Sequence, residues 1–191
     1  MNLLYLIFIP LVTAVAVLAM RSRAAIRIVA LVGALLQLVA SLALLMHFKA
    51  ASAIDQQRVI HFDQQFNWFP SWGINFHIGV DGIAVAMILL TALVVVAGVL
   101  ISWKVEKQAK EFFFLLILLS LGAYGFFVSL DLFVMFFFLE VAVIPKYLLI
   151  GIWGSGKKEY SANKLALLLM GGSALVLVGM LGLYFSAGPG R

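Results

Sequence analysis

The sequence predicts an all-α polytopic membrane protein with about six transmembrane helices and one longer outer loop that forms a β-hairpin. Three observations support this class. Of the 191 residues, 65% are hydrophobic and 11% are charged, whereas a soluble domain has about 25% charged residues. Uncharged stretches of about 18 residues or more, long enough to cross a bilayer, recur along the chain. The basic residues gather between these stretches, so the net charge of +5 indicates membrane orientation rather than nucleic-acid binding.

Six stretches are transmembrane candidates, at 1–20, 28–46, 82–103, 112–130, 132–153 and 165–186. We interpret the first as a retained helix rather than a secretory signal, because no basic residues precede its apolar part. The fourth and fifth stretches meet at Ser129-Leu130-Asp131, with almost no connection between them. These two therefore form a tight helical hairpin.

The one long loop, at 47–80, contains the signals of a β-hairpin. Residues 74–80 alternate apolar and polar side chains, which is typical of a strand. A partner strand is expected around 58–66, with Pro70 and Gly73 in the connection.

The distribution of basic residues predicts the orientation. Nine lie in the loops after the first, third and fifth stretches: Arg21, Arg23, Arg27, Lys104, Lys107, Lys110, Lys157, Lys158 and Lys164. Three lie on the other side: Lys49, Arg58 and Arg191. This bias places the N-terminus outside and the three basic loops in the cytoplasm or matrix.

Glu140 is the strongest candidate for chemistry. It lies about 13 Å into the stretch that opens near Asp131, which is close to the middle of a hydrocarbon core about 30 Å thick. An ionisable group there costs on the order of 3 kcal/mol and is usually found where protons or ions move. The alternative is a protonated carboxyl that joins helices by hydrogen bonds.

Three residues near Glu140 are secondary candidates. Pro145 removes a helical hydrogen bond and predicts a kink or break. Lys146 lies about 120° around the helix from Glu140 and about 9 Å along it, so a direct ion pair is not expected. We interpret Lys146 mainly as a side chain that extends toward the inner face, with a relay role as the alternative. Asp131, like Asp81, starts a helix and is interpreted as a cap, with proton entry as the alternative.

Other kinds of site have little support. The chain has no cysteine, which excludes iron–sulfur and zinc-thiolate ligation by its own residues. His47, His61 and His77 are widely spaced and are interpreted as surface residues, so no metal site is predicted. We see no quinone, haem or NADH site in the sequence.

One segment carries a resemblance to a known family. Residues 127–154, FVSLDLFVMFFFLEVAVIPKYLLIGIWG, resemble the fifth helix of subunit M (chain 4) of proton-pumping NADH–quinone oxidoreductase, complex I. The Asp81-Gly82 pair after the outer strand and the run Ser161-Ala-Asn-Lys164 also fit this family. Two residues depart from it: Leu139 stands where tryptophan is usual, and Lys146 where an apolar residue is usual.

The resemblance implies a non-redox subunit of a translocase, whose helix-five glutamate, matched by Glu140, acts with a lysine on helix seven. It implies that 1–128 are helices 1–4 with the outer loop, that 129–191 begin the proton-translocating unit, and that the chain is an N-terminal portion. The partners would be other membrane subunits of complex I, with NADH, FMN, iron–sulfur clusters and quinone held elsewhere in the complex. The expected location is the bacterial inner membrane, with the mitochondrial inner membrane as the alternative.

Two other functions stay open at this point. A D-type subunit of a multi-subunit sodium/proton antiporter, or the matching subunit of a membrane hydrogenase, shares the helix-five glutamate. A non-transporting membrane scaffold would instead keep Glu140 permanently protonated.

Overall fold

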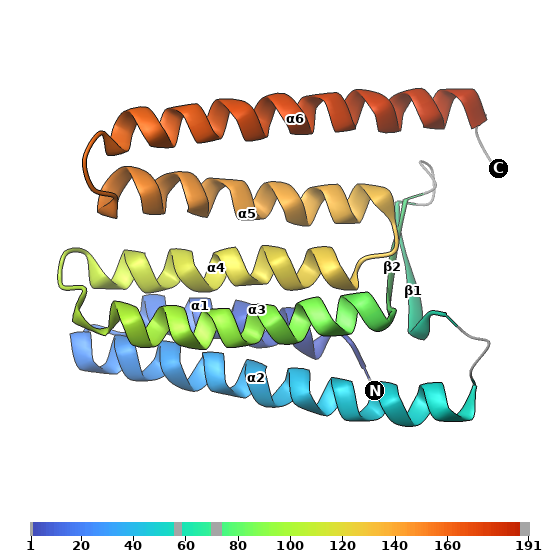
Figure 1. The fold of residues 1–191 in the computed structure, drawn as a ribbon, viewed down its shortest axis with the longest axis horizontal. Coiled ribbons are helices and arrows are strands. Elements are labelled where there is room, and N and C mark those ends of the chain that lie inside the picture. The colour runs from blue at the N-terminus through green and yellow to red at the C-terminus, as the bar shows by residue number, and fades with distance from the viewer. Residues whose placement is uncertain (1, 56–58, 70–73, 188–191) are drawn as a thin grey trace.

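Six α-helices of the described residues lie side by side with their long axes aligned, and a two-stranded β-hairpin crosses one end of them (Figure 1). The computed structural model describes residues 2–55, 59–69 and 74–187. The helices are α1 (Tyr5–Ala19), α2 (Arg23–Ile54), α3 (Gly82–Ile101), α4 (Ala109–Val128), α5 (Leu132–Trp153) and α6 (Lys158–Ala187), with a short 3₁₀ helix η2 (Ser102–Lys104) after α3. The strands are β1 (His61–Phe69) and β2 (Ile74–Val80).

Five of the helices in the described part of the chain, α2 to α6, are long and apolar enough to cross a membrane, and α1 is a shorter apolar helix of 15 residues. The predicted class of helical membrane protein is thus confirmed. Helices α2 and α6 extend beyond their uncharged stretches, because the residues next to each stretch include good helix formers such as alanine and lysine. The length of the apolar stretch therefore underestimates the length of these two helices.

Helices α1 to α4 form a bundle with buried apolar residues along its length. At one point α1 and α2 approach so closely that a side chain at Gly33 would overlap Thr13. Small residues are common at such contacts within membranes, where close packing rather than the hydrophobic effect joins helices.

Helix α5 packs on the outside of this bundle through α4. A Cβ atom at Gly122 would lie 2.8 Å from the Ala142 Cβ, and one at Gly125 would overlap the Phe138 ring. Helix α6 covers the opposite side of α5, and most of its own surface is exposed. The predicted hairpin of the fourth and fifth stretches is confirmed, with three residues between α4 and α5.

The β-hairpin is confirmed as well. Strand β2 has the expected bounds, and β1 lies three residues later than expected; Arg58, Pro70 and Gly73 fall outside the described residues. The Leu130 N–H donates to the His77 carbonyl at 2.8 Å, so β2 is attached to the connection that precedes α5. The hairpin thereby anchors the end of the helix that carries Glu140.

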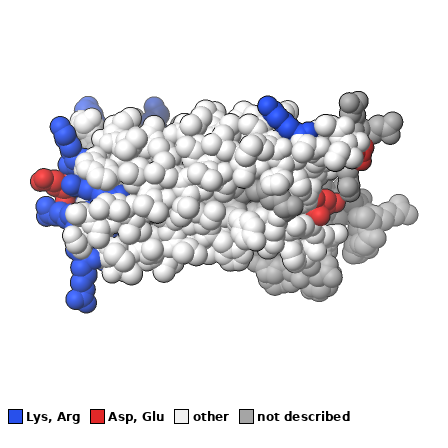
Figure 2. Space-filling model, turned by 90° about the horizontal axis from the view of Figure 1, so that it is seen from below, with Lys and Arg blue, Asp and Glu red and all other residues white. Residues whose placement is uncertain are grey.

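The two ends of the bundle differ in charge. In Figure 2, lysine and arginine side chains gather at the end opposite the β-hairpin. This end holds the connections α1–α2, α3–α4 and α5–α6 (Figure 1). The basic clusters that the sequence places in three separate loops thus meet on one face.

Candidate functional site

Glu140 lies within α5, nine residues after Asp131 and 13 before Trp153. With a rise of 1.5 Å per residue, it is about 13 Å from one end of the helix and about 20 Å from the other. Its Oε1 atom is buried and has no hydrogen-bond partner among the residues that the structure describes. A buried acceptor without a partner costs on the order of 1–3 kcal/mol, and more when it is charged.

Two contacts identify the face of α5 on which Glu140 lies. The Tyr147 hydroxyl donates to Asn163 Oδ1 of α6 at 3.1 Å, and a Cβ atom at Gly151 would lie 3.7 Å from the Cβ of Ala162 of α6. Glu140 precedes Tyr147 by seven residues and Gly151 by 11, so the three positions differ by about 20° to 40° around the helix. Glu140 therefore belongs to the face of α5 that α6 covers.

The same spacing identifies the residue of α6 opposite Glu140. Helices α5 and α6 are antiparallel (Figure 1), so a step of 11 residues back from Gly151 corresponds to a step of 11 forward from Ala162. That step ends at Ser173, whose side chain is buried although most of α6 is exposed. The Ser173 hydroxyl donates to the Met170 carbonyl at 3.1 Å, which leaves its oxygen lone pairs free to accept.

Sequence reasoning missed Ser173. A serine in an apolar span is unremarkable by itself, and only the pairing of α5 with α6 places it level with the carboxyl. The 11-residue spacing on both helices is the signal that could have found it, once Gly151 and Ala162 are known to touch.

Of the kink or break expected at Pro145, the break does not occur. Helix α5 is one continuous helix from Leu132 to Trp153, with Pro145 inside it and buried. Proline removes one helical hydrogen bond, but neighbouring helices can stabilise a membrane helix that contains it. Glu140 is therefore held on an uninterrupted helix.

Lys146 is half-buried and lies on a different side of α5. No ion pair joins it to Glu140, which agrees with the spacing argument. Within the described residues the recorded ion pair is between His77 and Asp63 of the β-hairpin.

Asp131 and Asp81 cap the helices that follow them. Asp131 Oδ1 accepts from the N–H groups of Phe133 at 2.8 Å and Val134 at 3.2 Å. Asp81 Oδ1 accepts from the Ala84 N–H at 2.7 Å. The predicted capping role is confirmed for both, and a cap of this kind stabilises a helix by about 1 kcal/mol.

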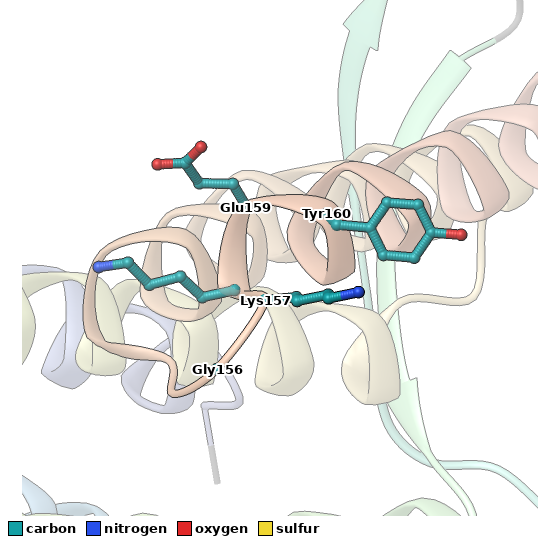
Figure 3. Close-up of a pocket in the computed structure, with 5 residues that line it drawn as sticks. Gly156, Lys157, Glu159 and Tyr160 are labelled. Atoms are coloured by element: carbon teal, nitrogen blue, oxygen red, sulfur yellow. The ribbon is translucent and has the colours of Figure 1, made fainter.

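The remaining candidates lie away from Glu140. A hollow at the start of α6 is lined by residues 156–160, whose side chains point in different directions (Figure 3); it does not include Glu140. Among the described residues no cluster of three or more His, Asp and Glu side chains is arranged to hold a metal. The surface interpretation is wrong for His61, which is buried with its ring against Phe48, because the hairpin folds onto the end of α2.

Comparisons with known proteins agree on one family. Residues 129–189 match the family described as NADH:quinone oxidoreductase/Mrp antiporter, TM. The chain is 35% identical over 186 residues to NAD(P)H-quinone oxidoreductase chain 4 2 of Thermosynechococcus vestitus, which covers 96% of this chain and 34% of that protein. It is 36% identical over 132 residues to the chloroplastic chain 4 of Angiopteris evecta, covering 68% of this chain and 27% of the relative.

Solved structures have the same fold. The membrane-bound sulfane sulfur reductase, an archaeal respiratory membrane complex, contains a chain that matches with a TM-score of 0.77 and 26% identity, over 93% of this chain and 36% of that one. Respiratory complex I from Thermus thermophilus matches with a TM-score of 0.77 and 24% identity, over 94% and 35%. This chain spans about a third or less of the length of these relatives. The chain belongs to the chain 4 (subunit M) family of complex I and NDH, and it covers part of that antiporter-like subunit.

Proposed function

We propose that this chain contributes to proton translocation as a non-redox subunit in the membrane arm of an NAD(P)H–quinone oxidoreductase, with Glu140 as the proton-handling group. The observation that carries the proposal is a carboxyl oxygen of Glu140, buried in mid-span without a hydrogen-bond partner in the described residues. Such an atom is costly as a purely structural feature. A proton-handling role would account for this energetic cost. The relatives of this chain are quinone oxidoreductase chains, which is consistent with such a role.

A carboxyl at this depth can act as a switch. In a low-dielectric site the charged form is disfavoured by desolvation and favoured by a nearby positive charge. Uptake of a proton removes the negative charge of the Glu140 carboxylate, and the approach of a cation favours release of that proton. The face of α5 that packs against α6 holds Glu140 in a fixed position for this gain and loss of a proton. Tyr147 and the oxygen lone pairs of Ser173 lie at the same contact between α5 and α6.

The neighbouring residues have lesser roles in this proposal. Pro145 leaves one backbone carbonyl of α5 without its helical donor, Asp131 fixes the start of α5, and Lys146 extends its stem toward the basic end of the bundle. The basic end faces the cytoplasm or matrix, with the N-terminus outside. Residues 129–191 begin the proton-translocating unit, and NADH, flavin, iron–sulfur clusters and quinone belong to other subunits of the complex.

Purification of the tagged chain with its native membrane assembly tests this function. The expected assembly contains a flavin-bearing dehydrogenase, reduces quinone with NADH or NADPH, and acidifies inverted vesicles as it does so. The family description also includes Mrp antiporters, so sodium/proton exchange is the rival activity. An assembly that exchanges sodium for protons and has no quinone reductase activity would contradict the proposal.

A further inference from the structure

A small cavity lies among the four helices of the α1–α4 bundle, away from Glu140. The centre of a water-sized sphere can occupy a volume of about 10 Å³ within this cavity. Four of its lining side chains are polar: Thr13 from α1, Gln37 from α2, and Ser120 and Tyr124 from α4. All four are buried, with Gln37 3% exposed and Tyr124 fully buried.

Gln37 is held in place by the proline of α1. Pro10 has no N–H, so the carbonyl of Leu6, four residues earlier, lacks its helical donor. Gln37 Nε2 donates to this Leu6 oxygen at 3.1 Å. The amide is thereby oriented, and its Oε1 atom is left buried with no partner in the described part of the chain.

The hydroxyl of Tyr124 also lines the cavity and is likewise buried with no partner among the described residues. The other two hydroxyls at the cavity already use their protons. Thr13 donates to the Ile9 carbonyl and Ser120 to the Ile117 carbonyl, each at 2.7 Å. Their oxygens can therefore only accept at the cavity.

We propose that this cavity is a binding site for one ordered water molecule. The water accepts a hydrogen bond from the Tyr124 hydroxyl and donates to Gln37 Oε1 and to the oxygen of Ser120 or Thr13. A water site needs about 10–15 Å³ of space for the centre of the water and two to four polar partners, and this cavity meets both conditions. The bound water joins α2 to α4, and through the Gln37–Leu6 hydrogen bond it also holds α1.

The direct test is a cryo-EM map of the protein in its native membrane assembly, at a resolution that resolves ordered water. We expect one density peak within hydrogen-bond distance of both Tyr124 Oη and Gln37 Oε1. A direct hydrogen bond between these two atoms, or a cavity without a peak, would overturn the proposal.

A pair of tyrosine variants gives a second readout. Tyr124→Phe keeps the ring and removes the donor to the water, while Tyr5→Phe removes a hydroxyl from a tyrosine that is 58% exposed and serves as the matched control. If water is bound, Tyr124→Phe lowers the thermal unfolding midpoint more than Tyr5→Phe and the density peak is lost. If the cavity is dry, Tyr124→Phe removes an unpaired buried hydroxyl, so an unchanged or raised midpoint contradicts the proposal.

Discussion

Lys146 and Glu140 are six residues apart on α5, but they differ in side-chain length and in distance from the ends of the helix. Lys146 is about 10 Å from the end of α5 at Trp153, and a long aliphatic stem lets its ammonium group extend toward that end. Glu140 has a shorter stem and is farther from both ends. Its carboxyl cannot reach either end of the helix by a change of rotamer, which is why we propose the carboxyl of Glu140, and not the amine of Lys146, as the proton-handling group.

The role of Lys146 can be tested by substitution. Lys146→Arg and Lys146→Met should both leave proton pumping within about fivefold of the native rate, because a solvated interfacial charge contributes less than about 1 kcal/mol. Proton uptake by vesicles and the amount of assembled subunit are the measurements. Loss of pumping in Lys146→Met, with assembly and electron transfer intact, would instead require a relay role.

At the scale of single residues, the sequence predicted the position of Glu140 along its helix, because that position follows from counting along a mainly apolar span. It could not predict the direction in which Glu140 points. Helix α5 is apolar on all sides, so its periodicity does not distinguish the face toward α4 from the face toward α6. That face follows only from tertiary contacts, such as Tyr147 to Asn163.

At the scale of elements, α5 is positioned by close contact with α4 at Gly122 and Gly125. Gly125→Ala should destabilise this pair by about 1–3 kcal/mol, because the new methyl group overlaps the Phe138 ring. The measurement is the thermal unfolding midpoint of the assembled protein, with partial recovery expected in the Gly125→Ala, Phe138→Leu double variant.

Gly98→Ala is the matched control, since its Cβ would lie 3.9 Å from the nearest Leu116 atoms, an ordinary contact. It should leave the midpoint unchanged or raise it slightly. Equal losses in Gly98→Ala and Gly125→Ala would mean that the α4–α5 contact is not the cause.

The strands show what local pattern can and cannot predict. Alternation marked β2 with its observed bounds, whereas β1 begins at His61 rather than near 58. The register of β1 is fixed by pairing with β2 and includes irregularities between His61 and Gln64 and between Asn67 and Phe69. Irregularities of this kind change the pairing without changing the local sequence pattern.

At the scale of the whole molecule, the separation of charge between the two ends predicts the topology (Figure 2). The absence of native cysteine allows single cysteines at Ala53 and Ser155 to be labelled against a clean background. Both positions are exposed. Ala53→Cys should react with a membrane-impermeant thiol reagent from outside, and Ser155→Cys only after permeabilisation. The reverse pattern would invert the proposed orientation.

Ala53 is a better position for the cysteine than its neighbour Ser52, whose hydroxyl lies 3.4 Å from His61 Nε2 in a partly buried contact.

Six apolar helices and a basic end could be predicted from composition and spacing alone. The packing of α6 against α5, next to Glu140, could not be predicted in this way. Most of α6 is apolar in every direction, so the face that it buries depends on the helix against which it packs.

The ratio of protons pumped to electrons transferred in Glu140→Gln is the measurement that tests the central claim most directly. Glutamine keeps the shape of the side chain and removes its charge, so the subunit should assemble while the ratio falls close to background. Glu140→Asp keeps the charge on a shorter stem and should retain part of the pumping. A normal ratio in Glu140→Gln would contradict the account, because Glu140 would then be a structural group between α5 and α6.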